Sequence, residues 1–137
     1  MGKKTVSIIV AASTLSGIIY LMSRTKALVI RVLDNGQVVD TLRAGETYDV
    51  ELTVRNKSDE PQQWDIFLSA SSNLRTFIQP ERTGYSFQAK ETKRIQVPLP
   101  IPADAAGEAG GASIYAYVIT PDDTKKIGER VLVLPVV

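Results

Sequence analysis

Residues Thr47–Asn56 read TYDVELTVRN, and this stretch decides the fold class. Two rows of side chains alternate along it, one apolar and one polar: Tyr48, Val50, Leu52 and Val54, then Asp49, Glu51, Thr53 and Arg55. Successive side chains of a β-strand point to opposite faces of its sheet, so this period predicts a strand with one buried and one solvated face. We therefore expect the apolar row in a core and the polar row in water.

Further short strands are predicted on both sides of this stretch. They are Leu28–Leu33, Gln37–Leu42, Trp64–Ala70, Arg75–Gln79, Thr92–Leu99, Ala112–Thr120 and Lys126–Val137. Asp34-Asn35-Gly36 is a hairpin signal, because Asn and Gly tolerate positive φ. Pro98 and Pro100 cannot donate to a ladder, so their strand is expected at a sheet edge or leaving the sheet. Seven or eight short strands in about 110 residues predict an all-β, immunoglobulin-like antiparallel sandwich.

Three motifs follow one another in this region. They are Gly45-x-x-Tyr48-x-Val50-x-Leu52-x-Val54-x-Asn56, then Lys90-Glu91-Thr92 before Ile95-x-Val97, then Pro102-Ala103-Asp104-Ala105-Ala106-Gly107. Over residues 40–120 their order and spacing resemble the bacterial and archaeal immunoglobulin-like modules of the CARDB and NEW3 type. The chain departs from that pattern at Lys90, where Gly is usual, and in the extra Gly110-Gly111. The resemblance implies a spacer or binding module of a cell-envelope protein, and it carries over no catalytic residue.

Residues 1–26 differ in composition from the rest. They contain four basic residues and no acid, whereas residues 27–137 contain the other 12 basic residues and all 15 acids, a net charge of −3. Thr5–Met22 is uncharged over 18 residues. As a helix it would be about 27 Å long, close to the ~30 Å hydrocarbon core of a bilayer. We therefore expect a membrane-anchor helix in residues 1–26 and a β-sandwich domain in residues 27–137.

Within the anchor, two sets of residues have separate predicted roles. The lipid-facing set is Ile8, Ile9, Val10, Leu15, Ile18, Ile19 and Leu21. The small residues that would let another helix approach are Ala12, Ser13, Ser16 and Gly17. Basic residues flank both ends, so charge alone does not orient the helix. The β-domain is expected on the extracytoplasmic side.

Other readings of the same segment stay open. Val10-Ala11-Ala12 has the small residues of a signal-peptide cleavage site, although the apolar run continues beyond it. The run is also short enough for a buried helix of a soluble fold. Met1-Gly2 begins a myristoylation motif, but Val6 occupies the position that requires Ser or Thr.

Composition removes most catalytic chemistries. The chain has no Cys and no His, which excludes disulfides, thiol catalysis, Cys/His zinc sites and histidine bases. Its net charge of +1 gives no support to nucleic-acid binding. The acidic pairs Asp59-Glu60 and Asp122-Asp123 lie in predicted turns, where such residues are ordinary. We expect no enzyme activity, no cofactor and no metal site.

Four further residues remain as candidates. Trp64 shares a face with Ile66 and Leu68 and is expected in the core. Tyr115 and Tyr117 share a face of their strand; Tyr115 also stands at a position like the tyrosine corner. The alternative for this pair is an aromatic interaction surface. Asn56-Lys57-Ser58 is an N-glycosylation sequon in a polar turn, which predicts an accessible amide.

These features together predict a single-pass membrane protein with an immunoglobulin-like domain that works by binding or assembly. Its expected partners are membrane lipid, other helices in the membrane and an extracytoplasmic protein, with no nucleic acid. Two alternatives place the chain in a larger assembly. One is a subunit of a pilus-like or archaellum-like filament or stator. The other is a tethered accessory protein of a membrane complex or virion.

Overall fold

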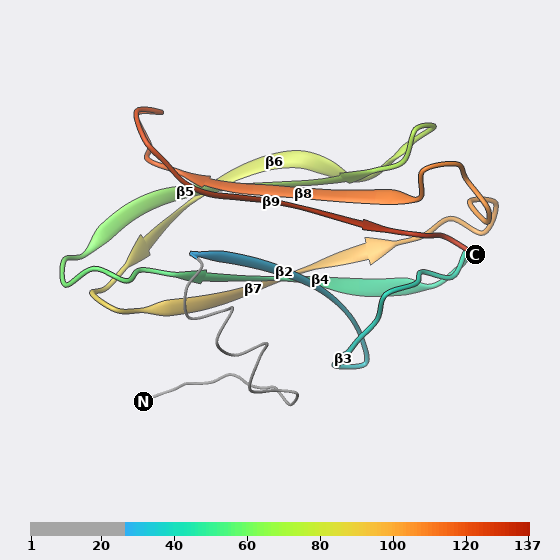
Figure 1. Ribbon diagram of the computed structural model, residues 1–137, viewed down its shortest axis with the longest axis horizontal. Helices are drawn as coiled ribbons and strands as arrows, with labels where there is room; N and C mark the ends of the chain where they lie inside the picture. Colours follow the sequence, from blue (N-terminus) through green and yellow to red (C-terminus); the bar gives the residue numbers. More distant parts are fainter. Residues whose placement is uncertain (1–26) are drawn as a thin grey trace.

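The computed structural model describes residues 27–137, so the predicted anchor and its helix-packing residues lie outside the described residues. The described part forms eight strands in two four-stranded antiparallel sheets that pack face to face (Figure 1). The strands are β2 (Leu28–Asp34), β3 (Gln37–Val38), β4 (Thr47–Arg55), β5 (Gln62–Ser71), β6 (Thr76–Phe87), β7 (Thr92–Pro100), β8 (Ala112–Ile119) and β9 (Lys126–Leu134). The predicted all-β sandwich is confirmed at this level.

The strand order shows how the chain passes between the layers. The first sheet has the order β3-β2-β4-β7, and the second has the order β6-β5-β8-β9. The chain therefore crosses from the first sheet to the second after β4, returns for β7, and crosses again to β8. The inward rows of the two sheets form one apolar core. Its least exposed members include Val32, Val50, Val54, Leu99, Ile114 and Val118.

The predicted turn and edge signals are confirmed. Asn35 and Gly36 have φ values of 51° and 83° and join β2 to β3, where Asp34 pairs with Gln37. The strand that contains Pro98 and Pro100 is β7, which lies at an edge of its sheet. Trp64 is in the core, 6% exposed, with its ring centroid 5.0 Å from that of Phe87.

Two strand predictions were wrong in length. The predicted strand Gln37–Leu42 is only two residues long, because Leu42 turns away to exchange backbone hydrogen bonds with Pro135 and Val137. The predicted strand Arg75–Gln79 overlaps only the start of β6, which is 12 residues long and runs from Thr76 to Phe87. This strand contains Pro80 and Gly84, and it lies at the edge of its sheet, where Pro and polar side chains are tolerated.

The prediction that Glu51 lies in water was wrong. Glu51 is 5% exposed on the outer face of β4, the central partner of β2 and β7. Its Oε1 accepts hydrogen bonds from Arg31 at Nη2 (2.6 Å) and Nε (3.2 Å), and its Oε2 accepts one from Gln96 (3.3 Å). Cross-strand neighbours on both sides therefore enclose the carboxylate, which alternation alone does not reveal.

Replacing Glu51 with Ala should destabilise the domain by about 1–3 kcal/mol, because the buried carboxylate's hydrogen bonds with Arg31 and Gln96 are lost. Equilibrium denaturation measures this change. Glu81→Ala, on the exposed edge strand β6, is the matched control and should cost no more than about 0.5 kcal/mol. Equal costs for the two variants would contradict the structural role of Glu51.

The predicted accessibility of the Asn56 amide was also wrong. Asn56 is 1% exposed, and its Nδ2 donates to the carbonyls of Glu60 (2.8 Å) and Gln88 (3.0 Å). Its Oδ1 accepts from the backbone N–H and the hydroxyl of Ser58. The side chain that a glycan would modify thus holds the β4–β5 and β6–β7 loops together in the folded domain.

Gly111 stands where the chain enters β8 and has a φ of +65°. A Cβ there would lie 2.3 Å from the carbonyl oxygen of Leu134, which is backbone and cannot simply rotate away. Gly107 has a similar φ of +74°, but a Cβ there would meet nothing within 4 Å. A side chain at Gly107 would therefore meet backbone strain alone, whereas one at Gly111 would meet backbone strain and a steric clash.

Gly107→Ala should cost about 1–2 kcal/mol, the strain of a left-handed residue with a Cβ. Gly111→Ala should cost more, since it adds displacement of the end of β9. Denaturant midpoints of the two variants measure the difference. If the Gly111→Ala domain were as stable as the Gly107→Ala domain, displacement of the end of β9 would have no measurable free-energy cost.

Candidate functional site

The outer face of the second sheet is apolar where solvent would be expected. Alternation in the central strands β5 and β8 and the edge strand β9 places Ile119 and a set of five further apolar side chains on it. We call this set the aromatic face: Phe67, Tyr115, Tyr117, Val131 and Val133. Register holds its members together, since Phe67 pairs with Tyr117, and Tyr115 pairs with Val131.

The three rings form one cluster. Phe67 and Tyr117 are stacked, with centroids 4.8 Å apart and planes at 12°. Tyr115 packs against both, at 5.9 Å from Phe67 and 5.7 Å from Tyr117, with its plane steeply inclined to each. Mutual packing of this kind limits side-chain rotation and makes a preformed apolar surface.

Charged groups fix the rim of the cluster. The hydroxyl of Tyr115 donates to Oε2 of Glu129, and Lys126 lies 3.4 Å from the other oxygen of that carboxylate. Lys126 Nζ also lies 5.3 Å from the centroid of the Tyr117 ring. The hydrogen bond to Glu129, followed by burial, raises the pKa of Tyr115 to about 12. The same hydrogen bond is the main reason that the pKa of Glu129 is lowered.

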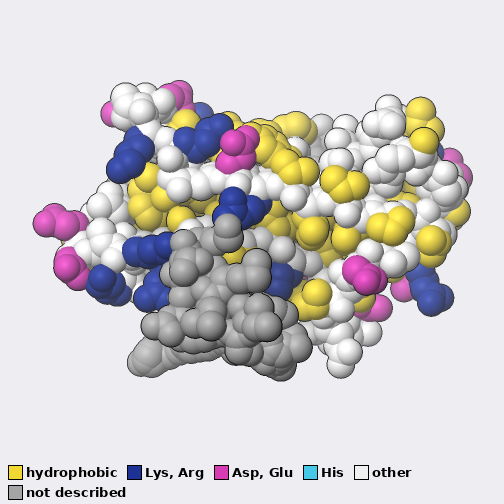
Figure 2. Space-filling view, in the orientation of Figure 1, with side chains coloured by type: hydrophobic (Ala, Val, Ile, Leu, Met, Phe, Trp, Pro, Cys, Tyr) yellow, Lys and Arg dark blue, Asp and Glu magenta, His cyan; other side chains and the backbone are white. Residues whose placement is uncertain are grey.

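The valines extend the surface to the edge of the sheet. Val131 is 59% exposed and Val133 is 54% exposed. Figure 2 shows hydrophobic side chains spread along the side of the molecule on which β9 runs. Ser69 and Ser71 lie on the same outer face and pair with Tyr115 and Ser113. The result is an apolar strip with small hydroxyl-bearing neighbours.

The sequence predicted part of this face. Tyr115 and Tyr117 lie on it, half-buried, on the central strand β8. Tyr115 does not form a tyrosine corner, because its hydroxyl donates to the Glu129 carboxylate rather than to an upstream carbonyl. Sequence reasoning missed Phe67, Val131 and Val133, although Phe67 alternates with the core residues Ile66 and Leu68.

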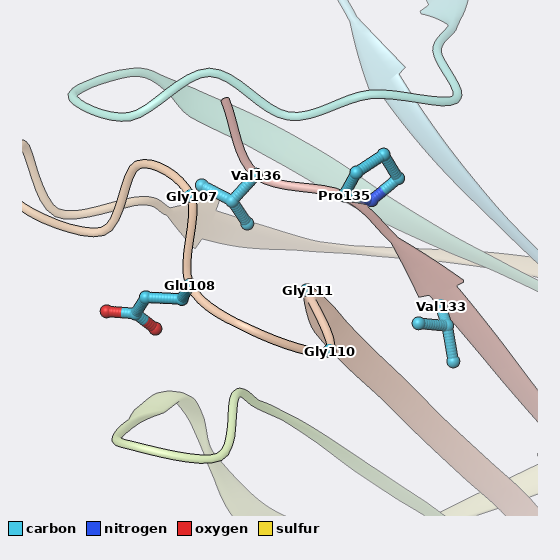
Figure 3. A pocket seen from close by; sticks show the side chains of 7 residues that line it. All are labelled: Gly107, Glu108, Gly110, Gly111, Val133, Pro135 and Val136. Atoms are coloured by element: carbon cyan, nitrogen blue, oxygen red, sulfur yellow. The ribbon is translucent and has the colours of Figure 1, made fainter.

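A hollow of about 420 Å³ lies at the end of the sandwich near the C-terminus (Figure 3). Gly107, Glu108, Gly110, Gly111, Val133, Pro135 and Val136 line it. Its one ionisable side chain, Glu108, extends to the other side of the loop from Val133 and contacts Arg75 Nη2 at 2.6 Å. No convergent acid–base pair lines this hollow.

The acidic turns are occupied by local contacts. Asp122 Oδ1 accepts from the hydroxyls of Thr120 and Thr124, and Asp123 pairs with Arg82 at 2.6 Å. Within residues 27–137 no three acidic side chains come together as metal ligands would. The same residues contain no helix that is long and apolar enough to cross a membrane. The predicted anchor residues lie outside this range.

Comparison with known proteins gives distant structural similarity alone. No family model matches the chain, and no curated protein matches it. Among solved structures, it is similar to an alkylpurine DNA glycosylase of Pseudomonas fluorescens, with TM-score 0.45 and 13% identity. A β-glucosidase of Listeria innocua matches with TM-score 0.39 and 18% identity.

Both alignments cover 80% of this chain, but only 31% of the glycosylase and 16% of the glucosidase. Similarity at this level carries no argument about activity, so the site is judged on its own chemistry.

Replacing Tyr115 with Phe should raise the pKa of Glu129 toward its ordinary value, because the hydrogen bond that lowers it is lost. Carboxyl ¹³C NMR titration measures this shift. Since the pKa of Glu129 is lowered by folding, its contribution to stability is present above the unfolded value and is lost as pH falls. The contribution of Tyr115 has the opposite sense, full below pH 10 and lost as pH rises toward about 12.

The matched control is Tyr117→Phe, which keeps the Tyr115–Glu129 hydrogen bond. It should leave the pKa of Glu129 unchanged. An unchanged pKa in Tyr115→Phe would contradict the assigned contact.

Proposed function

We propose that the protein is a non-enzymatic, single-pass membrane protein whose immunoglobulin-like domain binds a protein partner on the extracytoplasmic side of the cell envelope. The observation that carries this proposal is the aromatic face. It is a preformed apolar surface on the outer side of one sheet, separate from the core between the two sheets. Apolar, aromatic surfaces of this kind are typical of protein interaction sites.

The strand order supports the immunoglobulin-like assignment. Apart from the two-residue β3, the first, second and fifth strands form one sheet, and the fourth, third, sixth and seventh form the other. Immunoglobulin-like sandwiches likewise place strands A, B and E in one sheet and C, F and G in the other. The fourth strand differs from strand D of constant-type domains, because it pairs with the third strand instead of joining the first sheet.

Backbone geometry supports the resemblance to the CARDB and NEW3 modules. Lys90 stands where those modules usually have Gly, and its φ is +64°. Gly45 and Gly107, at the motif positions, have φ values of +88° and +74°. Left-handed residues favour Gly, which explains why the pattern has Gly at such positions. Lys90 is stabilised there by hydrogen bonds to Ser58 and Lys57 carbonyls.

The chemistry of the described surface supports the non-enzymatic assignment. The carboxylates Asp122, Asp123, Glu108 and Glu51 are engaged by neighbours within the domain. The aromatic face presents rings, methyl groups and hydroxyls, which suit burial against a partner rather than bond cleavage. In a filament, stator or virion, the same face would pack against another subunit.

Substituting the exposed valines tests the proposal. The measurement is photo-crosslinking to a neighbouring protein in native membranes, from a photo-reactive amino acid placed at the position of Ser69. Val131→Lys with Val133→Lys should lower the crosslinking yield by roughly tenfold or more, because the interface would bury two charges. Both side chains are more than half exposed, so the fold should persist. Val38→Lys is the control: its side chain is 60% exposed on β3, in the other sheet.

Two outcomes would contradict the proposal. Equal crosslinking in the Val131/Val133 and Val38 variants would show that the aromatic face does not bind the partner. Recovery of the full-length chain in the soluble fraction would show that residues 1–26 do not anchor the protein in a membrane.

A further inference from the structure

Three arginines lie on the outer face of the first sheet. Arg31 of β2, Arg55 of β4 and Arg94 of β7 all project from this side, which faces away from the aromatic face. Arg31 pairs in register with Glu51, and Arg94 pairs with Thr53, which lies between Glu51 and Arg55 along β4. We call these three residues the arginine face.

This face has an excess of positive charge. On the outer face of this sheet the three arginines accompany two carboxylates, Asp49 and Glu51, and Arg31 already binds Glu51. Arg55 Nε is buried, and within the described part of the chain no hydrogen-bond partner reaches it. Burial lowers the pKa of Arg94; the charge of Glu51 opposes this, and the charge of Arg31 adds a smaller lowering. A further anion would offset the cost of burying this charge.

The arginine face adjoins the point where the described chain begins. The N–H of Arg55 donates to the carbonyl of Ala27 at 3.0 Å, and Arg31 lies four residues along β2 from that point, about 13 Å. The apolar run of residues 5–22 is separated from Ala27 by only four residues, which also span at most about 13–14 Å. All three guanidinium groups are therefore within reach of a surface in which that run is embedded.

The opposite end of the sandwich is unsuited to an anionic layer. Residues 27–137 carry a net charge of −3. The opposite end of the sandwich contains five acidic residues, Asp34, Asp40, Glu46, Asp104 and Glu108, and two basic ones, Arg43 and Arg75. In Figure 2, Lys and Arg side chains gather in the half of the view where β2 begins.

We propose that the arginine face binds the phosphates of anionic lipid headgroups in the membrane that holds residues 5–22. This proposal rests on the membrane anchoring proposed above, and it adds that the domain lies with its arginine face toward the membrane. Guanidinium groups form paired hydrogen bonds with phosphate oxygens, and their planar donors lose little freedom in doing so. Basic residues close to a membrane anchor are each attracted to an anionic surface within a Debye length.

Single cysteines can report this orientation, because the full-length chain contains no Cys. Thr92→Cys places a fluorescent label beside Arg55, its partner in register, at an exposed position. Ser113→Cys places the label on the outer face of the other sheet. The full-length protein is reconstituted in vesicles of phosphatidylcholine, with or without phosphatidylglycerol, that contain a headgroup-linked quencher.

The label at residue 92 should be quenched more strongly when phosphatidylglycerol is present, and added salt should reverse this. The label at residue 113 should not respond to phosphatidylglycerol. Arg55→Gln with Arg94→Gln should shift the balance between bound and free orientations by roughly 25-fold, about fivefold for each charge near the surface. Arg43→Gln with Lys125→Gln removes the same charge from exposed positions elsewhere and should leave the response intact.

Three results would overturn the proposal. An equal response of the labels at residues 92 and 113 would show no preferred face. A response that survives Arg55→Gln with Arg94→Gln would assign it to other residues. If soluble polyglutamate changed the fluorescence of the label at residue 92 more than phosphatidylglycerol vesicles did, the face would be assigned to an acidic protein. Failure of the chain to float with either vesicle would instead refute the anchor, and this orientation with it.

Discussion

The structure depends on the burial of two facing rows of apolar side chains. Val50, Leu52 and Val54 of β4 supply one row, and Ile114 and Val118 of β8 belong to the other; all are at most 1% exposed. Both strands are central in their sheets, so every other strand is held by pairing with them or with their neighbours. Removing water from these rows offsets the entropy of ordering the chain. Because side chains alternate along a strand, burial of these rows also determines which side chains lie on the outer faces.

Alternation therefore predicts the inner half of the domain better than the outer half. The rows of β4, β5 and β8 were evident because each residue's environment follows from its strand's own period. The polar stretch that continues β6 was not evident, since an edge strand in water needs no apolar row. Glu51 and Asn56 were misread for a related reason: their burial depends on Arg31, Gln96 and Gln88, which are distant in sequence.

The candidate site was predictable only where it lay on one strand. Tyr115 and Tyr117 are two residues apart and reveal a shared face at once. Phe67 and Val131 join them through the β5-β8-β9 register, and Arg31, Arg55 and Arg94 meet through the β2-β4-β7 register. Registers of this length are set by the whole core and by turns such as those at Gly36 and Gly111, so no local pattern encodes them.

The two outer faces have opposite chemistry, and the fold constrains how they act together. Stacked sheets lie about 10 Å apart, so their outer faces point in opposite directions across one thin domain. If the arginine face rests on lipid phosphates, the aromatic face is turned away from the bilayer, toward the space where an extracytoplasmic partner would approach. Anchoring and recognition would then not compete for surface. The short segment between residues 22 and 27 would favour this orientation, because a long tether would let the domain rotate freely.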